Sequence, residues 1–108
     1  MAKVEINPGI CGLPSTVWAE LDPDTYRCKV TVESECAAIR KMGAELVEVD
    51  PFQEIALRRG DGPLTLRKAQ ELCSHSSCPV PSGIIKVVEV AAGLALPADV
   101  TMKLSKED

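Results

Sequence analysis

The chain has 108 residues, of which 45% are apolar and 26% charged, as in a globular domain rather than a disordered segment. Twelve basic residues against sixteen acidic ones give a net charge of −4, which does not favour binding to phosphate backbones or anionic lipids. We therefore expect one domain over residues 1–108, with neither nucleic acid nor a membrane as a partner. The N-terminus lacks the apolar run of a signal peptide, so the expected setting is the cytosol.

The first third of the chain shows the two-residue period of β-strands. Val4 and Ile6 alternate with polar neighbours up to a turn signal at residues 7–9, Asn-Pro-Gly. Two further alternating runs, residues 15–21 and 26–32, are separated by the turn sequence Asp-Pro-Asp-Thr. These two runs predict an antiparallel hairpin.

From Ser34 onward the apolar period becomes helical. Ile39, Met42, Leu46 and Val49 recur at three and four residues, which predicts a helix with Ser34 as its N-cap and with its end at Asp-Pro, residues 50–51. Shorter helices are predicted over residues 52–59 and after an N-cap at Thr65.

A last helix is predicted over residues 82–96, because Pro97 stops it. It is apolar except for one narrow stripe, which consists of Ser82, Lys86, Glu89 and Gly93. Such a helix either packs centrally against the sheet or is partly covered by a second copy, so a homodimer stays open. Finally, Val100, Met102 and Leu104 alternate with polar residues and predict a closing strand.

Together these elements predict an α+β fold, with a small, mainly antiparallel four-stranded sheet and helices packed on one face. The four expected strands are the three in the first third of the chain and the one near the C-terminus. The pattern leaves the strand order open.

The five cysteines differ in their expected settings. Cys28 and Cys73 lie on apolar faces and are predicted to be core residues. Cys11 lies in a loop rich in glycine and proline, whereas Cys36 and Cys78 lie at or just before predicted helix N-termini. Unpaired backbone N–H groups and the helix dipole stabilise a thiolate there, and the thiolate is the form that binds metal or attacks an electrophile.

Three motifs surround these last three cysteines: Pro8-Gly-Ile-Cys-Gly12, Ser34-Glu-Cys36, and the segment 75–97, HSSCPVPSGIIKVVEVAAGLALP. In these motifs the chain resembles a family of short, functionally uncharacterised proteins from anaerobic bacteria and archaea, along nearly its whole length. The resemblance implies a compact α+β domain and a shared use of the three thiols at Cys11, Cys36 and Cys78. It implies no reaction or substrate.

Three functions remain open at this point. If Cys11, Cys36 and Cys78 converge, they would bind zinc or an iron–sulfur cluster, with His75 or an exogenous group as a fourth ligand. No Cys-x-x-Cys pair is present, so such a metal site depends entirely on tertiary structure.

The second function is a thiol-dependent redox or nucleophilic enzyme that uses Cys78 or Cys36, and a disulfide between Cys73 and Cys78 is conceivable if the helix ends between them. The third is a non-catalytic homodimer in which the cysteines are packing residues.

Overall fold

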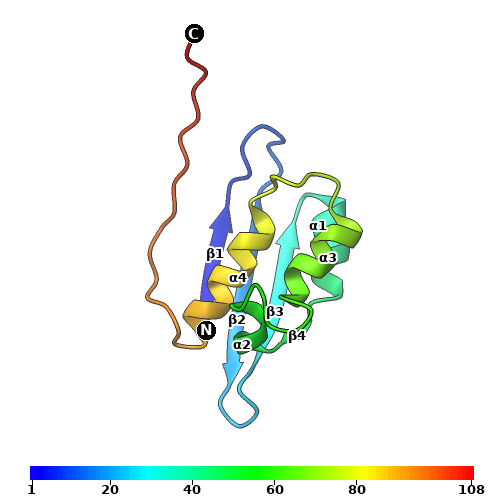
Figure 1. Cartoon of the computed structure of the whole chain (residues 1–108), viewed down its shortest axis with the longest axis vertical. Coiled ribbons are helices and arrows are strands. Elements are labelled where there is room, and N and C mark those ends of the chain that lie inside the picture. Colours follow the sequence, from blue (N-terminus) through cyan, green and yellow to red (C-terminus); the bar gives the residue numbers. More distant parts are fainter.

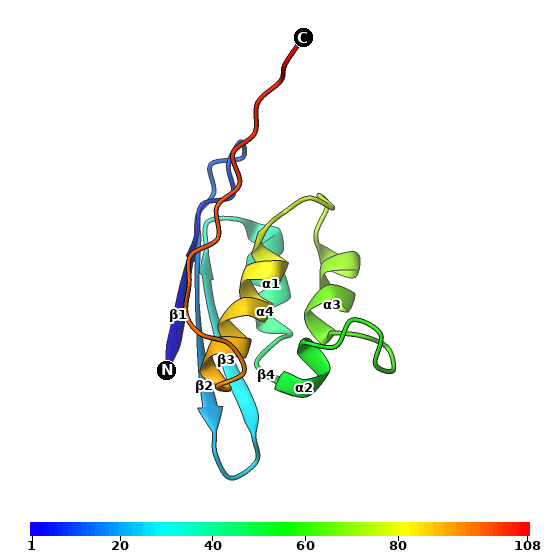
Figure 2. The same ribbon diagram turned by 60° about the vertical axis from the view of Figure 1, so that its left-hand side comes forward.

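The computed structural model describes all 108 residues, and it contains a four-stranded antiparallel sheet with four helices (Figure 1). The helices lie on one face of the sheet and the other face is uncovered (Figure 2). The predicted α+β class and its one-sided packing are therefore confirmed. No helix combines the length and the apolar character that crossing a membrane would need.

The strands follow one another in space in the same order as in the chain. They are β1 (Ala2–Ile6), β2 (Ser15–Asp22), β3 (Arg27–Ser34) and β4 (Glu48–Val49). The predicted hairpin is formed by β2 and β3, where Val17 lies opposite Val32 and Ala19 lies opposite Val30. Because side chains alternate between the two faces, the inward residues of β2 are buried while Thr16, Trp18 and Glu20 face outward.

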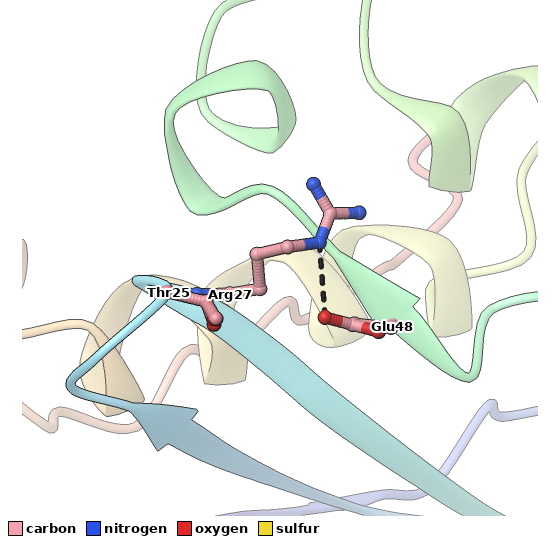
Figure 3. Close-up of polar contacts among 3 residues, drawn as sticks. All are labelled: Thr25, Arg27 and Glu48. Atoms are coloured by element: carbon pink, nitrogen blue, oxygen red, sulfur yellow. Dashed lines mark hydrogen bonds and ion pairs between the residues drawn. The ribbon is translucent and has the colours of Figure 1, made fainter.

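The fourth strand is not the predicted one. Residues 98–108 contain no helix or strand, so the prediction of a closing strand at Val100–Leu104 was wrong. The sheet is instead completed by β4, where Val49 lies opposite Cys28 of β3. An ion pair joins the same two strands, because Arg27 Nε lies 3.0 Å from Glu48 Oε1, and the Arg27 backbone N–H also donates to Thr25 Oγ1 (Figure 3).

The helices are α1 (Ala37–Ala44), α2 (Pro51–Glu54), α3 (Leu64–Leu72) and α4 (Val80–Ala91). Three of them, α1, α2 and α4, are shorter than their sequence pattern predicts, and α3 begins slightly earlier than predicted. The N-caps also differ, since Cys36 and Pro63 precede α1 and α3 in place of Ser34 and Thr65. The Ser34 hydroxyl is nevertheless used at this helix start, because it accepts a hydrogen bond from the Cys36 N–H at 3.0 Å.

Helix α4 is the central element of the helical layer. It packs on β1 and β2 and also contacts α2 and α3, which realises the central packing predicted for it. Gly83 permits the close approach to β1, since a Cβ at this position would collide with the Ile6 side chain. The exposed Ser82 and Lys86 belong to the predicted polar stripe.

Candidate functional site

All five cysteines are free, and they fall into three environments. Cys28 is fully buried in the core beneath the helices, as predicted. Cys11 is exposed in the loop between β1 and β2. Cys36, Cys73 and Cys78 are half-buried and pack against the edge of the core.

The last three cysteines lie at one end of the molecule. The start of α1, the end of α3 and the start of α4 meet there, at the upper end in both views (Figures 1 and 2). Cys36 is the N-cap of α1, Cys73 is the C-cap of α3, and Cys78 immediately precedes Pro79, the N-cap of α4. We refer to Cys36, Cys73 and Cys78 as the thiol cluster.

The pKa of Cys73 reflects this arrangement. Burial is the main cause that raises its pKa, and the neighbouring thiols of Cys78 and Cys36 raise it further. Charge interactions weaken with distance and with solvent screening, so this effect indicates that Cys78 and Cys36 lie on the same side of the molecule as Cys73. A fourth sulfur borders the cluster, since Cys73 Sγ lies 3.9 Å from Sδ of the buried Met42. Burial therefore favours the neutral, protonated form of Cys73.

A tight turn explains how Cys73 and Cys78 become neighbours. The Cys73 N–H donates to the Ala69 carbonyl at 2.8 Å, which is the last bond of α3, and the chain then leaves the helix. The Cys78 N–H donates to the His75 carbonyl at 3.2 Å and closes a turn before α4 begins. The helix thus ends between the two cysteines, which is the condition that a disulfide between them requires.

The opposite end of α3 is anchored by Glu54, which the sequence pattern did not single out. Its carboxylate is buried and accepts hydrogen bonds from the N–H groups of Leu64 at 2.7 Å and Thr65 at 3.0 Å, and from the Thr65 hydroxyl. A carboxylate at this position satisfies N–H groups that the first helical turn leaves unpaired, and it complements the helix dipole. Glu54 therefore helps to fix the helix that carries Cys73. The only signal for this role in the sequence was that Glu54 stands ten positions before Leu64, the first residue of α3.

A surface lysine connects α3 to α1. Lys68 Nζ lies 3.1 Å from the carboxylate of Glu45 and 3.3 Å from that of Glu71, and hydrogen bonds to these two groups raise the pKa of Lys68. Glu45 is the C-cap of α1 and Glu71 lies on α3. The Lys68–Glu45 ion pair therefore joins the two helices whose ends carry Cys36 and Cys73, while the Lys68–Glu71 pair lies within α3.

The trio Cys11, Cys36 and Cys78, predicted to bind metal, is not assembled as a ligand set. No group of three or more His, Cys, Asp or Glu side chains is arranged to hold a metal ion. Cys11 lies in the exposed loop, and His75, the expected fourth ligand, is exposed on the turn between α3 and α4. Cys73 packs against the core, as predicted, and stands at the same end of the molecule as Cys36 and Cys78 (Figure 1). Binding of zinc or an iron–sulfur cluster therefore stays a prediction.

Comparison with known proteins gives a family but no activity. No curated protein and no solved structure matches the chain. Residues 2–104 match the model of a family described as a family of unknown function, DUF6951, and this range includes every helix and strand and all five cysteines. Because the match spans nearly the whole chain, this protein belongs to the DUF6951 family.

Proposed function

We propose that this protein is a thiol redox module in which Cys73 and Cys78 interconvert between a dithiol and a disulfide. The supporting observation is the thiol cluster itself, in which three half-buried thiols stand at the start of α1, the end of α3 and just before α4, at one end of the molecule (Figure 1). Only a short turn joins Cys73 and Cys78, so no helix opposes their approach. Cys36 is the third thiol of the cluster and a neighbour of the reacting pair.

The reaction we propose is thiol–disulfide exchange with a low-molecular-weight disulfide as the oxidant. The Cys78 thiolate attacks one sulfur of that disulfide, which forms a mixed disulfide and releases one thiolate. Cys73 then attacks the Cys78 sulfur, which forms the Cys73–Cys78 disulfide and releases the second thiolate. The protons of Cys73 and Cys78 pass to the two released thiolates, so two protein thiols are oxidised while one small disulfide is reduced to two thiols.

The roles of the two cysteines follow from their surroundings. Burial and the neighbouring thiols raise the pKa of Cys73, so this sulfur stays protonated during the first step and leaves the attack on the small disulfide to Cys78. In the second step Cys73 loses its proton to the released thiolate as it attacks the Cys78 sulfur. Cys78 lies next to the start of the twelve-residue helix α4, where the helix dipole favours negative charge. Cys78 is therefore the attacking thiol in the first step.

The test is a redox titration of the full-length protein in glutathione buffers, followed by acid trapping, alkylation and mass spectrometry of the peptides. We expect a peptide linked through Cys73 and Cys78, and a mixed disulfide that accumulates at Cys78 in Cys73→Ser. Cys11→Ser is the matched control, because this exposed thiol lies outside the cluster, and it should leave the midpoint potential unchanged. Random pairing among all cysteines, or full alkylation of both residues in oxidising buffer, would disprove the proposal.

Soft-metal binding is a second candidate function, and it is supported by the number of sulfur atoms at this end of the molecule. Cys73 Sγ lies 3.9 Å from the thioether sulfur of Met42, Cys36 and Cys78 stand at the same end of the molecule (Figure 1), and thiolate and thioether ligands favour soft metals. The loop that carries Cys11 projects from the same end (Figure 1), so it is the segment that would bring Cys11 toward Cys36 and Cys78.

Protein produced without oxygen would test this candidate through its content of zinc, iron and acid-labile sulfide. Stoichiometric metal that is lost in Cys36→Ser and Cys78→Ser supports it, and the comparison of Cys11→Ser with Cys73→Ser identifies the third ligand. Metal-free protein that does not take up added Zn²⁺ or Fe²⁺ and sulfide refutes it.

A further inference from the structure

The sheet has one long free edge. β1 pairs only with β2, so the N–H and C=O groups on its other side have no strand partner. The opposite edge is β4, which has only two residues and offers little backbone for further pairing. An unpaired edge strand is a template for another strand, and β1 is the longer of the two edges.

The C-terminal tail, residues 98–108, is the second unpaired feature. It extends away from the domain beside β1 and makes the molecule 52 Å long against 28 Å and 27 Å in the other directions (Figures 1 and 2). Its side chains of Val100, Met102 and Leu104 are 61%, 71% and 91% exposed. Apolar residues that alternate with polar ones form the pattern of a strand with one covered face, yet in the single chain nothing covers them.

The tail and β1 share one pattern over the same length. β1 reads Ala-Lys-Val-Glu-Ile, and residues 100–104 read Val-Thr-Met-Lys-Leu, so both alternate apolar and polar residues over five positions. In β1 the apolar residues face the helices, where Val4 is only half-buried, and Lys3 and Glu5 face outward. A neighbouring strand with the tail sequence would cover the flank of Val4 with Met102 and would extend the polar outer face.

Charge selects the direction of pairing. In a parallel arrangement with Met102 beside Val4, Lys103 lies beside Glu5 and the charges are opposite. In the antiparallel arrangement with the same central pair, Lys103 lies beside Lys3. Opposite charges on neighbouring strands stabilise a sheet and like charges destabilise it, so parallel pairing is favoured.

We infer that β1 binds the C-terminal tail of a second copy of this chain, so that two copies exchange residues 100–104 as a fifth, parallel strand in each sheet. The occupant is a second copy because a single chain leaves its tail unpaired although it passes its own β1. The segment between Gly93, which has a φ of 74°, and the tail acts as the hinge of this exchange. The matched family range extends to residue 104 and includes the whole exchanged strand.

The test is sedimentation equilibrium of the full-length protein over a range of concentrations from about 1 µM to several hundred µM. We expect a monomer–dimer equilibrium whose dissociation constant rises more than tenfold in Met102→Asp, because the charge would have to enter the covered face. Ser105→Asp adds the same charge in the same tail on the outward side, and it should change the constant less than threefold. Neither variant threatens folding, because the tail lies outside the core.

Charge reversal tests the register. Lys103→Glu should weaken the dimer, and Glu5→Lys combined with Lys103→Glu should restore it. A strict monomer at all concentrations overturns the inference, as does a dimer that is unaffected by Met102→Asp. Protection of the tail amides from hydrogen exchange in a monomer would show that the tail binds its own β1, which also overturns the role of the second copy.

Discussion

Replacement of Glu54 tests the buried anchor of α3. In Glu54→Ala, the buried N–H group of Thr65 and the half-buried N–H group of Leu64 lose their acceptor, at a cost of about 1–3 kcal/mol each, while the Thr65 hydroxyl can rotate toward another acceptor. We therefore expect the free energy of unfolding to fall by about 4 kcal/mol. Glu54→Gln keeps one acceptor oxygen but loses the charge, so we expect a decrease of about 2 kcal/mol.

Urea unfolding followed by far-ultraviolet circular dichroism measures both variants. A decrease of about 4 kcal/mol is a large part of the roughly 5–15 kcal/mol that stabilises a typical domain, so the Gln variant guards against an unfolded Ala variant. Glu71→Gln is the matched control, because the Glu71 side chain is 58% exposed and its ion pair with Lys68 is worth less than about 1 kcal/mol. A loss below about 1 kcal/mol in Glu54→Ala, or one equal to that of the control, would refute the capping role.

Three further predictions concern the core and its boundaries. Burial raises the pKa of the Cys28 thiol above its ordinary value of 9.0, so the stabilisation from its neutral form is present below about pH 9 and is lost as the pH rises through the raised pKa. The free energy of unfolding between pH 8 and 10.5 should therefore fall less steeply in Cys28→Ala than in the wild type. Gly43→Ala should destabilise the protein by about 1–3 kcal/mol, despite the higher helix propensity of alanine, because the new Cβ would lie 2.6 Å from the Val32 Cβ. Adding Val32→Gly, which removes the contacted Cβ, should recover part of that loss, and additive losses in urea unfolding would contradict the clash. Tyr26→Phe removes the 2.5 Å hydrogen bond to the carbonyl that follows α4, so we expect a loss of about 1 kcal/mol and faster hydrogen exchange at the end of this helix. Unchanged exchange there would argue against the role of the hydroxyl.

The strand hairpin and the central helix could be predicted because their signals are local. Residues 15–21 and 26–32 alternate strictly, and the turn between them allows only a short antiparallel connection. The boundary between α1 and β4 could not be predicted, because Leu46 and Val49 fit a helical period as well as a buried irregular segment. Val49 is part of a strand because it pairs with Cys28 of β3, and this partner is 21 residues away in the chain.

Only part of the thiol cluster could be predicted, because its assembly also depends on contacts between distant parts of the chain. Cys36 and Cys78 were correctly placed at helix starts, which are local features. Cys73 has the apolar neighbours of a core residue in its own helix, and only the packing of α3 beside α1 and the turn before α4 bring it to the other two thiols.

The sequence alone therefore determined the class of fold, the hairpin and the apolar character of α4, because these follow from side-chain periodicity within a few residues. Only the tertiary structure decided which segment became the fourth strand, which thiols became neighbours and which acid anchors α3. These depend on contacts between residues far apart in the chain, and local preferences do not specify such partners. The alternation of Val100, Met102 and Leu104 shows most clearly the limit of prediction from sequence. A segment with a strand pattern becomes a strand only where it pairs with the edge of a sheet.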